Sequence, residues 1–134
     1  MTLPMSVDPT QPPVARSFLV VDDDEAVRLV TFEMLRRLGF DVTTADCGER
    51  ALEQTSHQSF DLVLLDLAMP TMSGMEVFSS LREREPEARV IFMTGYSKEE
   101  FSDVLAANQK TTSVLSKPFP MQELKSSVET MLAR

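Results

Sequence analysis

The stretch Leu62-Val63-Leu64-Leu65-Asp66 decides the fold of this chain. Four consecutive apolar residues without polar alternation are typical of a strand that is buried on both faces. Such strands lie at the centre of parallel sheets, with helices covering both sides. The stretch therefore predicts the central strand of an α/β sheet, with Asp66 at its carboxyl end.

Similar short runs lie on either side of this stretch, and segments of helical periodicity separate them. The expected strands are residues 18–21, 42–45, 62–65, 90–93 and 114–116. The expected helices are residues 25–38, 47–56, 75–84, 98–107 and 121–133. Strand and helix alternate five times, which predicts a parallel sheet with right-handed crossovers and helices on both faces.

The composition indicates one folded domain that follows a tail. The chain has 134 residues, of which 43% are hydrophobic and 25% charged, as is ordinary for a globular domain. Residues 1–17 contain half of the eight prolines and show no periodicity. We therefore expect residues 1–17 to form a disordered tail and residues 18–134 to form the domain.

Charge and hydropathy argue against two classes of partner. The net charge of −8 opposes a direct, sequence-independent grip on nucleic acid. No apolar run is long enough to span a bilayer, and the first residues lack the pattern of a secretory signal. Cys47 is the single cysteine, so no disulfide can form within the chain. Together these features favour a cytoplasmic location without a membrane partner.

Polar residues follow four of the five expected strands. Asp22 and Asp23 follow the first, Asp66 the third, Thr94 the fourth, and Lys117 comes just after the fifth. The carboxyl ends of parallel strands meet at one edge of the sheet, where open α/β proteins bind their ligands. We therefore expect these five side chains to form one site.

Three neighbouring carboxylates repel one another unless a cation neutralises them. Mg²⁺ prefers oxygen ligands and usually takes one or two carboxylates, whereas zinc prefers His and Cys. The expected Mg²⁺ ligands are Asp22, Asp23, Asp66 and the backbone carbonyl of Ala68. Asp24, in contrast, is expected only to cap the helix that follows.

Asp66 is also the expected nucleophile, because a carboxylate can attack a phosphoryl group and form an acyl phosphate. Such a transfer requires positive charge and hydrogen-bond donors around the phosphoryl oxygens. Thr94 and Lys117 are expected to bind those oxygens.

Four segments together resemble the receiver domain of bacterial two-component response regulators. They read FLVVDD at residues 18–23, DLVLLDLAMPTMSG at 61–74, VIFMTG at 90–95 and KPF at 117–119. The resemblance covers about residues 17–134. It implies a flavodoxin-like, doubly wound (βα)₅ fold with a five-stranded parallel sheet in the order 2-1-3-4-5.

The resemblance also implies a function in signal transduction. Asp66 would take a phosphoryl group, with Mg²⁺, from the phosphohistidine of a sensor histidine kinase or histidine phosphotransfer protein. Phosphorylation would shift an inactive–active equilibrium through Thr94 and so act on a downstream protein. No turnover of a separate substrate is expected. The resemblance is equally compatible with a single-domain regulator, a relay intermediate and part of a larger hybrid kinase or regulator.

Several positions bear on how such a receiver would behave. Val114 stands where many receivers carry Tyr or Phe, and Ser73 where an acidic residue or Asn is common. Ala68 and Tyr96 occupy positions that tune loss of the phosphoryl group in this family. Ala68 offers no polar group to orient water, so slow hydrolysis of the acyl phosphate is expected.

Three other functions remain open. A haloacid-dehalogenase-type phosphatase would use Asp22 as its nucleophile and Mg²⁺ as its cofactor. A flavin-binding module of the same fold would need amide and hydroxyl donors after the first strand, where this chain is acidic. A pseudo-receiver would bind protein partners without being phosphorylated.

Overall fold

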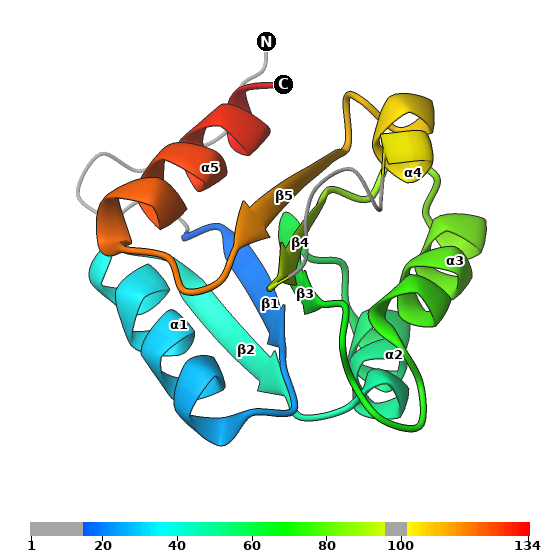
Figure 1. The fold of residues 1–134 in the computed structure, drawn as a ribbon, viewed down its shortest axis with the longest axis horizontal. Helices are drawn as coiled ribbons and strands as arrows, with labels where there is room; N and C mark the ends of the chain where they lie inside the picture. The colour runs from blue at the N-terminus through cyan, green and yellow to red at the C-terminus, as the bar shows by residue number, and fades with distance from the viewer. Residues whose placement is uncertain (1–14, 96–101) are drawn as a thin grey trace, which may run out of the picture.

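Strands and helices alternate throughout the computed structural model, which describes residues 15–95 and 102–134 (Figure 1). The strands are β1 (Ser17–Val21), β2 (Asp41–Ala45), β3 (Leu62–Asp66), β4 (Val90–Thr94) and β5 (Thr112–Ser116). The helices are α1 (Glu25–Arg37), α2 (Gly48–His57), α3 (Gly74–Arg84), α4 (Ser102–Ala107) and α5 (Met121–Ala133). The expected alternation is confirmed.

The five strands form one parallel sheet in the order β2-β1-β3-β4-β5. This is the flavodoxin-like order expected above, in which the chain changes direction across the sheet between β1 and β3. Val21 pairs with Leu65, and Asp66 pairs with Met93. The carboxyl ends of β1, β3 and β4 are therefore nearly level, which brings the loops that follow them to one edge.

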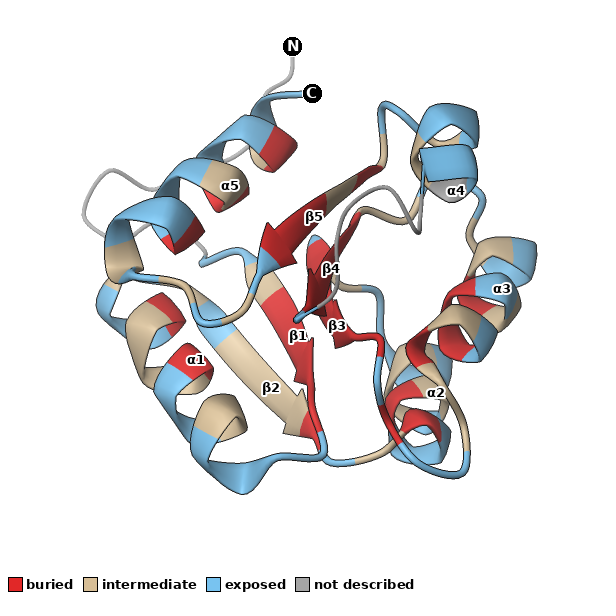
Figure 2. Ribbon diagram, in the orientation of Figure 1, coloured by how far each residue is buried: buried red, intermediate tan, exposed pale blue. Residues whose placement is uncertain are grey.

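Helices cover both faces of the sheet, with α1 and α5 on one side and α2, α3 and α4 on the other (Figure 1). Alternate residues of β3 face the two layers. Leu62 and Leu64 belong to the apolar cluster that includes α1 and α5, whereas Val63 and Leu65 belong to the cluster that includes α2 and α3. All five residues of β3 are buried, as predicted for the central strand (Figure 2).

The element ends differ from the predicted ranges by at most two residues where the structure describes them. β5 begins at Thr112, two residues earlier than expected, and Thr112 is buried. The expected start of the fourth helix, at residue 98, lies outside the described residues, as do residues 1–14 of the expected tail. Gly39 follows the C-cap of α1, with a φ of 97° that L-residues rarely adopt. Within these described ranges, every helix is too short or too polar to cross a membrane.

Candidate functional site

Asp22 lies directly after β1, and its carboxylate is fully buried. Its backbone N–H donates to the carbonyl of Ala45, so pairing with β2 continues one residue beyond the strand. Its Oδ1 accepts from the backbone N–H of Asp24 at 2.9 Å, and its Oδ2 accepts from Lys117 Nζ at 2.7 Å. Each oxygen of this buried carboxylate therefore has a partner, as burial of a charged group requires.

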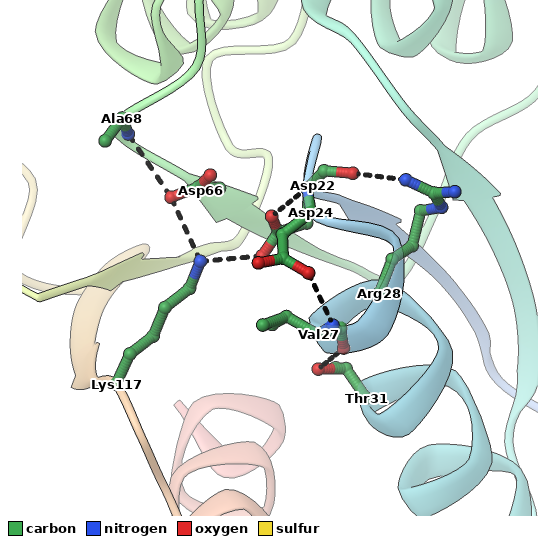
Figure 3. Close-up of polar contacts among 8 residues, drawn as sticks. All are labelled: Asp22, Asp24, Val27, Arg28, Thr31, Asp66, Ala68 and Lys117. Atoms are coloured by element: carbon green, nitrogen blue, oxygen red, sulfur yellow. Dashed lines mark hydrogen bonds and ion pairs between the residues drawn. The ribbon is translucent and has the colours of Figure 1, made fainter.

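The first turn of α1 makes hydrogen bonds to the acidic loop, residues 22–24, which joins β1 to α1 (Figure 3). Asp24 is the N-cap of α1, and its side chain accepts from the backbone N–H of Val27 at 3.2 Å. The predicted capping role of Asp24 is thus confirmed. Arg28, one turn further along, donates from Nη1 to the backbone carbonyl of Asp22 at 2.8 Å. No sequence pattern pointed to Arg28, although a cation so soon after an acidic run is a signal that could have been used.

Asp66 ends the central strand and is only 4% exposed. Its Oδ1 accepts from the backbone N–H of Ala68 at 3.2 Å and lies 3.3 Å from Lys117 Nζ. Ala68 itself is exposed at the start of the loop between β3 and α3. The carboxylate is therefore oriented by one backbone amide and one ammonium group.

Gly74, the first residue of α3, packs against the backbone that carries Asp66. Its N–H donates to the carbonyl of Leu67 at 3.3 Å. A Cβ at this position would lie 2.8 Å from Leu67 Cα and would clash with the carbonyl oxygen of Asp66. No sequence pattern pointed to Gly74, because a glycine in a loop gives no indication of which backbone lies beside it.

Lys117 lies between Asp22 and Asp66 and contacts both carboxylates. Its backbone N–H donates to the carbonyl of Thr94 at 2.8 Å, which continues the pairing of β4 with β5. The peptide bond that follows, to Pro118, is cis. The side chain is 22% exposed and reaches both Asp22 and Asp66 with its Nζ (Figure 3).

The structure brings the expected residues together to different degrees. Asp22, Asp66 and Lys117 are in direct contact. Asp23 is exposed, and its carboxylate belongs to the same acidic group. Thr94 is buried at the end of β4, one residue beyond the position opposite Asp66. Tyr96 lies outside the described residues.

The acidic group can hold a divalent metal. One carboxylate oxygen each from Asp22, Asp23 and Asp66 lies within 4.8 Å of the others. These donors are all hard oxygens from charged groups, the type that Mg²⁺ and Ca²⁺ prefer. Two of the three residues are buried while Asp23 is exposed, so the group is open to solvent on one side.

The surroundings of Asp66 favour the protonated form of its carboxyl group. Burial, reinforced by the negative charge of Asp22, raises the pKa of Asp66 from 3.8 to about 6, although Lys117 and the Ala68 amide oppose this. Burial also opposes the charged form of Lys117, but its hydrogen bond to Asp22 and the charges of both aspartates raise the pKa of this lysine overall. A cation bound here would favour the ionised form of Asp66.

An apolar groove of about 410 Å³ lies beside Lys117. It runs between α1 and the segment after β5, and its lining includes Val27, Val30, Pro118 and Phe119. Val30 is 53% exposed, and its neighbour Leu29 is 54% exposed. The groove therefore offers apolar surface next to the polar site.

The family model of the response regulator receiver domain matches residues 18–129. The alkaline phosphatase synthesis transcriptional regulatory protein PhoP of Bacillus subtilis is 34% identical over 119 residues, which make up 89% of this chain and 49% of PhoP. The response regulator receiver protein CpdR of Brucella abortus is 32% identical over 117 residues, 87% of this chain and 97% of CpdR. The chain thus spans about half the length of PhoP and nearly all of CpdR.

Solved structures agree with the observed topology. The response regulator protein TrrA of Thermotoga maritima, in complex with Mg²⁺-BeF, superposes with a TM-score of 0.77 and is 34% identical. The match covers 87% of this chain and 98% of TrrA.

Proposed function

The chain belongs to the response regulator receiver domain family, and from this premise we propose that it accepts a phosphoryl group on Asp66 in two-component or phosphorelay signalling. Receiver domains take phosphoryl groups from histidine kinases and are typically acceptors rather than turnover enzymes. The observation that carries the proposal is the contact of Lys117 Nζ with both Asp22 and Asp66. Through this contact, Lys117 bridges the proposed acceptor Asp66 and the neighbouring Asp22. It also places a positive charge where the phosphoryl oxygens would lie.

The proposed step is an in-line transfer from a phosphohistidine. A carboxylate oxygen of Asp66 attacks the phosphorus atom, a P–O bond forms, and the P–N bond breaks. The imidazole leaves with the electron pair of the broken bond. Lys117 Nζ and the hydroxyl of Thr94 donate to the phosphoryl oxygens, whose charge grows in the transition state.

We further propose that Mg²⁺ is the metal of the site, held by Asp22, Asp23, Asp66 and the backbone carbonyl of Ala68. The bound ion would neutralise the phosphoryl oxygens and the neighbouring carboxylates. Support comes from the oxygen-only donor set and from the Mg²⁺-BeF complex of TrrA, in which beryllium fluoride stands in for a phosphoryl group.

The proposed organisation is a receiver domain over residues 18–134 and a tail over residues 1–17. The proposed donor is a sensor histidine kinase or a histidine phosphotransfer protein, and the output is the binding of a downstream protein. A phosphatase that used Asp22 as its nucleophile is disfavoured, since both oxygens of that buried carboxylate already accept hydrogen bonds.

The test is intact mass after incubation with acetyl phosphate, with and without Mg²⁺. We expect one Mg²⁺-dependent phosphoryl adduct on the wild type and none on Asp66→Asn. Asp46→Asn is the matched control, because Asp46 is an exposed acid outside the acidic group. Absence of the adduct from the wild type, in a sample where a second receiver is labelled, would contradict the proposal and favour a pseudo-receiver.

A further inference from the structure

Arg28 occupies a position where a cation is normally disfavoured. It is the fourth residue of α1, close to the positive end of the helix dipole. Its side chain is nevertheless held in place, half-buried, with Nη1 donating to the main-chain carbonyl of Asp22 at 2.8 Å (Figure 3). One nitrogen of the guanidinium group is therefore hydrogen-bonded to the loop that carries Asp22 and Asp23.

The contact closes a ring of hydrogen bonds around this loop. Asp22 Oδ1 accepts from the backbone N–H of Asp24, and the Asp24 side chain accepts from Val27. The backbone N–H of Arg28 donates to the carbonyl of Asp24, and its side chain returns to the carbonyl of Asp22. Thr31 continues the chain of contacts by donating to the carbonyl of Val27. The peptide that joins Asp22 to Asp23 is thus fixed from the helix side.

We propose that Arg28 is a positioning residue for the metal site, which holds this peptide so that the carboxylates of Asp22 and Asp23 face Asp66. The inference rests on the proposed function, because it assumes that the acidic group binds Mg²⁺. Arg28 acts through the main chain of Asp22 and touches neither the metal nor the phosphoryl group.

Two effects of opposite sign meet at Arg28. The positive charge repels a divalent cation, whereas the fixed carbonyl keeps two ligands in register. Loss of a group that orients metal ligands typically weakens metal binding by about 10- to 100-fold. We therefore expect the positioning effect to exceed the charge effect.

The experiment is a calorimetric titration with Mg²⁺ alone, on the wild type, Arg28→Met, Arg28→Lys and Arg50→Met. Arg28→Met should bind Mg²⁺ at least about tenfold more weakly, and Arg28→Lys, which keeps a flexible donor, should recover part of the loss. Arg50→Met is the charge-matched control, since Arg50 lines the same 210 Å³ hollow as Arg28 and its ion pair with Asp46 is exposed. It should stay within about twofold of the wild type.

A kinetic readout separates positioning from general damage to the fold. The Mg²⁺ concentration that gives half-maximal phosphorylation by acetyl phosphate should rise about tenfold in Arg28→Met, while the rate at saturating Mg²⁺ should stay within about twofold. A lowered rate at saturation without a change in the half-saturating concentration would overturn the inference. The inference would also be overturned if Arg28→Met bound Mg²⁺ as tightly as the wild type, or more tightly. If Arg28→Met does not fold, the same comparison applies to Arg28→Lys. Failure of the wild type itself to bind Mg²⁺ would instead refute the metal site.

Discussion

Asp66 has a carboxyl group whose proton affinity changes strongly on folding. In the metal-free protein its pKa is raised from 3.8 to about 6, mainly by burial and by the charge of Asp22. The folded state therefore binds more protons than the unfolded state between about pH 4 and pH 6. The contribution of Asp66 to the free energy of unfolding should consequently fall as the pH rises through this window. The difference between the two pKa values corresponds to about 3 kcal/mol at most.

The first prediction is that Asp66→Asn is more stable than the wild type above pH 6, by about 1–3 kcal/mol in the absence of metal. The substitution removes a buried charge that the folded state tolerates poorly. Urea unfolding in a chelator at pH 4.5 and pH 7.5 measures the effect. The gain should be smaller at pH 4.5, where Asp66 is largely protonated, and Asp46→Asn should show no comparable gain. Equal stability of Asp66→Asn and wild type at pH 7.5 would contradict the raised pKa.

Ala68 gives a second prediction at the residue scale. It is exposed beside Asp66, and its methyl group cannot orient an attacking water. Ala68→Asn should therefore speed hydrolysis of the acyl phosphate, by roughly tenfold, because a positioned polar group assists the proton transfer. The decay of the phosphorylated mass with time measures this rate. Ala133→Asn, on the exposed end of α5, is the control, and identical decay of the wild type and Ala68→Asn would count against the assignment.

At the scale of elements, the start of α3 sets the position of the acceptor loop. Ser73 caps α3 in a reciprocal capping box with Glu76. The Oγ of Ser73 accepts from the Glu76 N–H, and Glu76 Oε1 accepts from the Ser73 N–H at 2.9 Å. The cap brings Gly74 against the backbone of Asp66 and Leu67. The backbone of Asp66 and Leu67 can approach the first turn of α3 this closely because residue 74 has no side chain.

The third prediction is that Gly74→Ala destabilises the protein by about 1–3 kcal/mol, as overpacking against backbone does, and also lowers the rate of phosphorylation of Asp66. Gly95→Ala is the matched control for stability, because no atom of the described residues lies within 4 Å of a Cβ built there. Chemical denaturation and labelling by acetyl phosphate measure the two effects. A Gly74→Ala protein with unchanged stability would show that the loop can yield without cost.

The elements that could be predicted from sequence are those with a strong pattern. The apolar run of β3 and the helical spacing of α5 predict which residues are buried, and the structure agrees with both. In α1 the helical spacing of apolar residues points to a face that includes Val30, and this prediction is wrong in part, because Val30 is 53% exposed while Thr31 and Leu35 are buried. β5 was harder to delimit, because it starts with a buried threonine rather than an apolar residue. The contacts of Arg28 and Gly74 could not be predicted, because periodicity identifies a face but not the backbone that meets it.

At the scale of the whole molecule, the apolar groove beside Lys117 offers a surface on which a protein donor could dock. Leu29 and Val30 are large apolar side chains more than half exposed on α1, and Val30 lines the groove together with Lys117 and Phe119. A small donor such as acetyl phosphate needs no docking surface, whereas we expect a protein that carries phosphohistidine to bury part of this groove.

The fourth prediction follows from this difference. Val30→Asp should slow phosphorylation by a phosphorylated histidine phosphotransfer protein by about tenfold, since a buried charge at an interface costs more than 1 kcal/mol. Phosphorylation by acetyl phosphate should stay within about twofold of the wild type. Ser79→Asp adds the same charge to an exposed position on α3 and should leave both rates nearly unchanged. Equal slowing with both donors would mean that Val30 affects the site itself rather than docking.

The double burial of β3 has a consequence for how this protein can change over generations. One apolar layer joins the sheet to α1 and α5, the other joins it to α2 and α3, and the sheet lies between them (Figure 2). Substitutions that share no contacts usually have additive effects on stability. Each layer can therefore accumulate substitutions independently of the other. As a result, the groove beside α1 and the surface of α2 and α3 can acquire new partners separately. Asp66 is the exception, because it ends the strand that packs against both layers. Substitutions in either layer can therefore affect its position.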